Sequence, residues 1–284
     1  MTSDGYVDVY LGLWCWVNDT FTVARVRNYL QSGMGGQSIR AQTAKAALLA
    51  GLAKRLGKYP GRTFELQGDQ YILTSIERVF MGKGAPDEIQ GVIWLASLCG
   101  LVTPETLAAY CDQNLGVDCG GFVANYWGMG HPVSTAASVE GDTGISPRTI
   151  WGKYPTLRRR TVAEIQVDDA AIFFEDVQVD NPDIIAKKVD GKYDPTTGSQ
   201  AFHIGLVSAK SATPATGNIN LDIAESSGAP SGDSGGNGVR VRHLVTVSAT
   251  VANNLVYCPD GKNRIYFIGR PSATPPYMPN SFGA

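Results

Sequence analysis

Long apolar segments are absent from this sequence, and so is a strong excess of either charge. No run of 18 or more apolar residues occurs among the 284 residues, so we expect no membrane-spanning helix. The 24 basic and 26 acidic residues give a net charge of −2, which excludes the broad basic surface that nucleic-acid binding requires. One local basic run, Arg158 to Arg160, is typical of a solvated surface, with contact to an anionic partner as the alternative.

Closely spaced cysteines are also absent. The five cysteines are an odd number and form no CxxC motif, so neither a disulfide framework nor a zinc site is predicted. They are Cys15, Cys99, Cys111, Cys119 and Cys258. This pattern favours a reducing compartment, and the acidic N-terminus does not resemble a secretory signal peptide. We therefore expect a protein that is cytoplasmic when made, without metal or cofactor, and that would need a non-classical or specialised secretion system to act outside the cell.

The first 115 residues carry mainly helical apolar spacing. Five segments show it: residues 22–30, 37–57, 66–80, 86–100, and a segment from Thr103, as N-cap, to about Cys111. Tyr6 to Trp14 alternates in part, which favours a strand.

The later part of the chain changes to short runs typical of strands, separated by turn-rich stretches. Strands are predicted at residues 170–174, 201–207, 219–225, 239–247 and 264–268. Helices followed by such a meander predict an α+β fold with a mainly antiparallel sheet.

This change of character suggests two parts and a tail. We expect a mainly helical region of unknown role over residues 1–105 and a second domain over 106–270. Insertions are expected at about 130–165 and 176–200, and a Pro-rich tail at 271–284.

The segment that begins at Cys119 has the strongest chemical signal. Apolar residues follow this cysteine at i+3, i+4, i+7 and i+8, which predicts a helix with Cys119 in its first turn and Asp118 as N-cap. The positive end of a helix favours a thiolate, so Cys119 is a candidate nucleophile. The alternative is a small core residue. Gly120 and Gly121 each cost about 1 kcal/mol in a helix, which indicates close approach by either substrate or a packed strand.

A cysteine nucleophile needs a nearby base, and the chain has three histidines. His203 lies on a predicted strand, and Gly205, two residues on, leaves room beside the imidazole. The alternative is an ordinary strand histidine. His131 is expected in a structural or substrate-binding loop, and His243 on an exposed strand face.

The base in turn needs a group that orients it. Glu225 shares an otherwise apolar face of the next predicted strand with Leu221 and Ile223, where a carboxylate needs a partner. We therefore expect Glu225 to pair with the base, with Ser226 and Asp222 as alternatives.

Four motifs in this order resemble those of the NlpC/P60 cysteine peptidases. They are Asp118-Cys-Gly-Gly-Phe-Val123, Val167-Asp-Asp-Ala-Ala-Ile-Phe-Phe174, His203-Ile-Gly-Leu-Val207 and Ile223-Ala-Glu-Ser-Ser227. The resemblance covers about residues 110–228. It implies a papain-like α+β core that cleaves peptide or amide bonds, typically in bacterial peptidoglycan stem peptides.

The resemblance also implies roles for individual residues. Cys119 would be the nucleophile, His203 the general base and Glu225 the orienting residue. The residues expected to contact substrate are Asp118, Gly120, Tyr110 and Ser226. The chain departs from the family pattern in having Gly120 for the usual serine, a longer spacing from Cys119 to His203, and Glu225 where His, Asn or Gln is more usual.

Two other functions fit the same residues. An acyltransferase or deamidase would use the same thioester intermediate, and a binding module would keep the fold with an inactive site. If the protein is a secreted antibacterial effector, we expect a cognate inhibitor protein as a partner.

Overall fold

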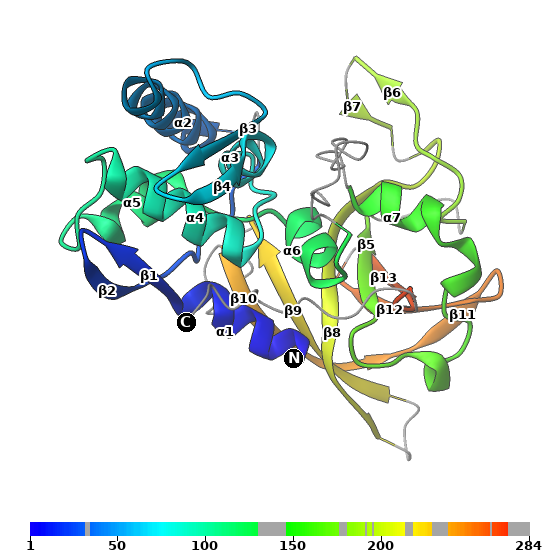
Figure 1. The fold of residues 1–284 in the computed structure, drawn as a ribbon. Coiled ribbons are helices and arrows are strands. Elements are labelled where there is room, and N and C mark those ends of the chain that lie inside the picture. Colours follow the sequence, from blue (N-terminus) through cyan, green and yellow to red (C-terminus); the bar gives the residue numbers. More distant parts are fainter. Residues whose placement is uncertain are drawn as a thin grey trace.

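The computed structural model describes residues 1–31, 35–129, 146–175, 181–190, 192–194, 196–213, 218–228, 238–261 and 263–271. These residues contain seven α-helices, most of them in the N-terminal half of the chain (Figure 1). The helices are α1 (Ser3–Leu11), α2 (Gly35–Leu56), α3 (Leu73–Phe80), α4 (Pro86–Leu98), α5 (Leu107–Asn114), α6 (Cys119–Tyr126) and α7 (Pro147–Lys153). No helix in this part of the chain is both long and apolar enough to cross a membrane.

The C-terminal half forms a seven-stranded antiparallel sheet, which confirms the predicted α+β class. Its strand order is β10-β9-β8-β5-β13-β12-β11. The strands are β5 (Ala170–Phe174), β8 (Ala201–Thr213), β9 (Asn218–Ser227), β10 (Gly238–Ser248), β11 (Thr250–Ala252), β12 (Leu255–Asp260) and β13 (Asn263–Ile268). All five predicted strands are present, and β11 and β12 were not predicted.

Three two-stranded hairpins accompany the sheet. They are β1 (Leu13–Val17) with β2 (Thr20–Ala24), β3 (Thr63–Leu66) with β4 (Asp69–Ile72), and β6 (Lys188–Val189) with β7 (Lys192–Tyr193).

The alternation of side chains along β8 and β9 gives the sheet two different faces. Ile204, Leu206 and Ala224 belong to a large core cluster that also contains residues of α1, α4 and α6. Leu221 and Ile223 belong to a second cluster on the other face. The large cluster contains residues of both predicted parts of the chain, and Figure 1 shows α6 where the N-terminal helices meet the sheet.

A buried arginine ties α6 to the N-terminal helices. Arg78 in α3 is 2% exposed and donates hydrogen bonds to Glu88 in α4 (3.1 Å) and to Asn125 in α6 (2.8 Å). It also donates to the backbone carbonyl of Lys83 (2.7 Å). Because a buried charge must be paired and hydrogen-bonded, this network fixes the position of α6 relative to α3 and α4.

The predictions for the N-terminal 30 residues were wrong in two places. Tyr6 to Trp14 is not a strand, because Thr2 caps α1 and the buried residues Tyr6, Val7 and Tyr10 follow helical spacing. Residues 22–30 are not a helix. Their first part is β2, which pairs with β1 through a two-residue turn, Asn18 and Asp19, with φ of 46° and 59°. Such a turn matches the twist of a hairpin.

Two further helices begin later than predicted. Residues 69–72 form β4, so the helix predicted over 66–80 begins at Leu73. The helix predicted from Thr103 begins at Leu107. The hydroxyl of Thr103 instead accepts a hydrogen bond from the backbone of Thr106 (3.4 Å), which closes a turn before the helix.

The described part of the first predicted insertion contains α7, which Ser146 caps and which packs against β5 and β8. Residues 130–145 of that insertion lie outside the described residues. So do parts of the 176–200 insertion and residues 272–284 of the tail.

Candidate active site

Cys119 is the first residue of α6, as the sequence predicted, and Asp118 is its N-cap. The Asp118 carboxylate accepts a hydrogen bond from the backbone N–H of Gly121 (2.6 Å) and pairs with Lys83 (2.6 Å). Burial raises the pKa of Asp118, and Lys83 opposes this effect. Asp118 therefore has a structural part in holding the start of the helix.

Three separate segments hold the turn before Cys119. The backbone of Val117 bonds to that of Asn28 (3.1 Å) and Leu30 (3.4 Å), and the N–H of Asp118 donates to the carbonyl of Gly82 (2.8 Å). The Ser226 hydroxyl of β9 donates to the carbonyl of Val117 (2.6 Å). Hydrogen bonds to three segments, around Asn28, Gly82 and Ser226, thus fix the position of this turn.

The structure explains Gly121 by packing. A Cβ at this position would lie 2.5 Å from the carbonyl oxygen of Gly82 and 3.0 Å from Cα of Lys83. The sequence predicted that either substrate or a packed strand approaches the paired glycines. At Gly121 the close neighbour is another part of the protein, but it is a loop and not a strand.

His203 and Glu225 meet on the sheet. His203 Nε2 lies 2.8 Å from Glu225 Oε2, and their side chains are 11% and 1% exposed. Gly205, directly opposite Glu225 in the register, makes this possible. A Cβ at Gly205 would lie 2.4 Å from Ile223 Cγ2 and 3.2 Å from Glu225 Cβ. The space that the sequence predicted beside the imidazole is therefore filled by the carboxylate residue.

Two arginines of β10 complete the surroundings of Glu225. Arg240, directly opposite Glu225, donates two hydrogen bonds to Oε1 (2.8 and 3.1 Å). Arg242 lies 3.6 Å from Oε2 and over the ring of Phe173, which also contacts His203. Burial raises the pKa of Glu225, but His203 and the arginines lower it by more, to about 2. Glu225 is therefore a carboxylate at neutral pH.

Cys119 is a neighbour of the His203 imidazole. Burial lowers the pKa of the imidazole, but its interactions with Cys119 and Glu225 raise it by more, to about 9. Cys119, His203 and Glu225 thus form one connected set, with the imidazole in the middle. Cys119 is 6% exposed, so water weakens these interactions little.

Tyr29 is a neighbour of Cys119 that the sequence did not predict. Burial raises the pKa of its phenol, and the charge of Cys119 raises it further. The hydroxyl donates its one proton to Gln31 (2.9 Å). Tyr29 lies in a segment predicted as helix, and no local pattern marks it as a site residue.

The remaining predicted residues lie in different surroundings. Tyr110 lies beside Cys111 and Cys99, and its buried hydroxyl has no hydrogen-bond partner in the described structure. Asp222, on the face of β9 opposite Glu225, bonds to His243 (2.8 Å). The His243 side chain is 77% exposed, which confirms its predicted surface position.

Two further residues that were predicted to contact substrate are buried. Gly120 lies in the first turn of α6, and the Ser226 hydroxyl already donates its proton to the backbone carbonyl of Val117. His131 lies outside the described residues. On the other face of β10, Arg240 and Arg242 have side chains only 10% and 13% exposed, because they face Glu225.

All five cysteines are free thiols, and within the described ranges no group of three or more His, Cys, Asp or Glu side chains could hold a metal ion. In comparisons with family models, curated proteins and solved structures, none matched this chain.

Proposed function

We propose that the protein is a cysteine hydrolase of the NlpC/P60 type, with a papain-like core, that cleaves a peptide or amide bond. The observation that carries the proposal is the position of His203 between Cys119 and the buried carboxylate of Glu225. A nucleophile, a base and an orienting group in this sequence of contacts make up the arrangement that acyl transfer through a thioester requires.

In the proposed reaction, the Cys119 thiolate attacks the substrate carbonyl carbon and forms a C–S bond. The C–N bond then breaks, and the imidazolium of His203 gives its proton to the departing nitrogen. Water, losing a proton to His203, attacks the thioester, the C–S bond breaks, and the carboxylic acid leaves while the Cys119 thiolate and the His203 imidazolium are restored. Glu225 holds the imidazole and stabilises its charged form, and Arg240 and Arg242 hold Glu225.

Two groups beside the sulfur suit the oxyanion that forms during this attack. No acceptor for the backbone N–H of Cys119 is present in the described structure, and this N–H lies at the positive end of α6. The phenol of Tyr29 lies beside the same sulfur, and its proton, which Gln31 accepts in this structure, would have to turn from Gln31 to the oxyanion.

The resemblance of the four motifs supports bacterial peptidoglycan stem peptides as the substrate. An enzyme of this kind that leaves the cell through a specialised system would act as an antibacterial effector, and its producer would need a cognate inhibitor. The same site would serve an acyltransferase or deamidase, which differ only in the acceptor of the acyl group or in the amide attacked.

The first test compares the alkylation rates of the five cysteines by iodoacetamide with mass spectrometry, in the wild type and in His203→Ala. Selective labelling of Cys119 that is lost in the variant is expected. Digestion of peptidoglycan fragments, analysed by mass spectrometry, then identifies the bond. The matched controls are Cys119→Ser, which should be inactive, and Cys111→Ser, a buried cysteine near Tyr110, which should be active. Equal labelling of all five cysteines would contradict the proposal.

A further inference from the structure

The outer face of the β1–β2 hairpin exposes four large apolar side chains. Trp14 is 58% exposed, Trp16 53%, Phe21 53% and Val23 41%. The register places Trp14 opposite Val23 and Trp16 opposite Phe21, so the four side chains lie together on one face. Contiguous apolar surface of this kind marks a binding surface more often than isolated exposed residues do.

This exposure follows from the strand pattern and not from a loosely packed hairpin. Leu13, Cys15 and Val17 alternate with the tryptophans and are 3% exposed or less, because they pack toward α4. The side chain of Gln90 in α4 also donates to the carbonyl of Trp14 (2.8 Å). The hairpin is thus held on a rigid support, with its aromatic side turned outward.

The aromatic rings pack against one another. Trp14 and Phe21 stack with ring centroids 5.0 Å apart and planes 15° apart, and Trp16 lies 5.2 Å from Phe21 with its plane tilted by 46°. The exposed parts of aromatic faces carry partial negative charge and attract polarised C–H groups. The saturated pyranose rings of a sugar chain present such C–H groups on their faces.

The charge of the hairpin agrees with a neutral partner. Residues 13–24 contain no lysine or arginine, and their one charged side chain is Asp19. A surface of this kind lacks the cations that anionic lipids and nucleic acids require.

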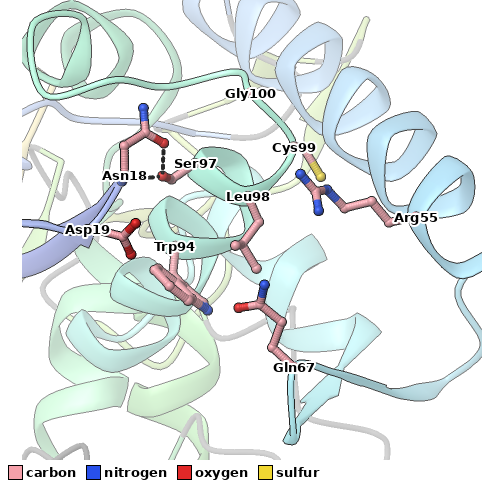
Figure 2. Close-up of a pocket in the computed structure, with 9 residues that line it drawn as sticks. All are labelled: Asn18, Asp19, Arg55, Gln67, Trp94, Ser97, Leu98, Cys99 and Gly100. Carbon is pink, nitrogen blue, oxygen red and sulfur yellow. Dashed lines mark hydrogen bonds between the residues drawn. The ribbon is translucent and has the colours of Figure 1, made fainter.

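A polar pocket lies at the tip of the same hairpin. Its volume is about 410 Å³. Figure 2 shows the residues that line it: Asn18, Asp19, Arg55, Gln67, Trp94, Ser97, Leu98, Cys99 and Gly100. Asn18 and Ser97 are joined by two hydrogen bonds of 2.9 Å, which hold the tip against α4. The guanidinium of Arg55, the carboxylate of Asp19 and the amide of Gln67 offer donors and acceptors for hydroxyl groups.

From the aromatic face and the pocket together we infer that the hairpin binds a neutral, linear glycan. The sugar rings stack on Trp14, Trp16 and Phe21, and the hydroxyl groups of one end reach the polar pocket. This site is separate from Cys119, and the inference does not depend on the reaction proposed there. The hairpin would hold the protein on a polysaccharide while the separate site at Cys119 acts on a different chemical group.

The test uses the full chain carrying Cys119→Ser and follows tryptophan fluorescence during titration with a soluble β-1,4-linked N-acetylglucosamine oligosaccharide and with a cellulose oligosaccharide. Saturable binding to at least one is expected, and Trp14→Ala and Trp16→Ala should each weaken it by about tenfold, as for the removal of a central aromatic anchor. Arg55→Met should weaken it by a smaller factor. Ile39→Ala, at an apolar residue of α2 that is 70% exposed, is the matched control and should bind as the parent does.

Other occupants of the face would overturn the inference. Phosphatidylcholine–phosphatidylglycerol vesicles and light scattering of the protein alone test for a membrane and for a second copy. Vesicle binding or self-association that requires Trp14 and Trp16, without oligosaccharide binding, would refute the glycan assignment, as would oligosaccharide binding that both tryptophan variants retain. Unchanged binding by Arg55→Met would refute the extension into the pocket. Circular dichroism of each variant shows that the fold is kept.

Discussion

Replacing Glu225 with glutamine is expected to destabilise the protein in a pH-dependent way. Glutamine keeps the size of the side chain and can still hydrogen-bond His203, but it removes the negative charge that His203, Arg240 and Arg242 share. The pKa of Glu225 is lowered from the ordinary 4.5 to about 2 in the folded protein, since these three cations outweigh the effect of burial. The difference corresponds to about 3 kcal/mol of folding free energy at neutral pH.

The sign of the pH dependence follows from this direction. A lowered carboxyl pKa contributes stability that is complete above 4.5 and is lost as the pH falls toward about 2. The raised pKa of His203 contributes stability that is complete below 6.5 and is lost as the pH rises through about 9. The two pKa shifts describe the same ion pair of His203 and Glu225, so their contributions to the folding free energy are not added.

Urea unfolding at several pH values measures the effect. The variant should lose about 3 kcal/mol near pH 7, and the loss should shrink as the pH approaches about 3. Asp222→Asn is the matched control: this carboxylate lies on the other face of β9, its side chain is 33% exposed, and it pairs with an exposed histidine. Its removal should cost less than about 1 kcal/mol. A loss in Glu225→Gln that is the same at every pH would refute the electrostatic explanation, and no loss near pH 7 would show that the charge adds no stability.

Three further substitutions test the surroundings of Cys119. Gly205→Ala places a Cβ 2.4 Å from Ile223 Cγ2 and should cost about 1–3 kcal/mol, seen as a lower urea midpoint; an unchanged midpoint would contradict the packing described here. Lys83→Met leaves the buried Asp118 without its cation and should cost about 3 kcal/mol near pH 7. Because burial already raises the pKa of Asp118, this loss should diminish as the pH falls and the carboxyl binds a proton, which acid titration of the unfolding free energy checks. Tyr29→Phe removes the hydroxyl beside the Cys119 sulfur and should slow alkylation of Cys119 near pH 7 by about tenfold with an unchanged unfolding midpoint, whereas an unchanged rate would show that this hydroxyl gives its proton to Gln31 alone.

Local pattern was sufficient to predict where the central residues of the candidate site lie. The N-cap and helical spacing placed Cys119 at the start of α6, and alternation with a glycine placed His203 and Glu225 within reach of each other. Both are short-range rules, because helix ends and strand faces depend on residues a few positions apart. The five main strands were found for the same reason.

The rest of the site depends on contacts between distant segments, which no local pattern specifies. Tyr29 reaches Cys119 only because its segment lies against the turn before α6. Arg240 and Arg242 were not predicted at the site, since nothing in β10 indicates that its neighbour carries Glu225. The N-terminal hairpin was missed because alternation and helical spacing overlap in such short segments.

The turn before Cys119 has a consequence for folding and for truncation. Its hydrogen bonds reach Asn28, Gly82 and Ser226, so its partners are dispersed over about 200 positions of the chain. Contacts of such high sequence separation form late, because the entropy of closing long loops must be overcome first. We expect Cys119 to reach its final position only in the last stage of folding. A shortened protein that begins at residue 106 would therefore lack two of the three supports of this turn and should not hold Cys119 in its place.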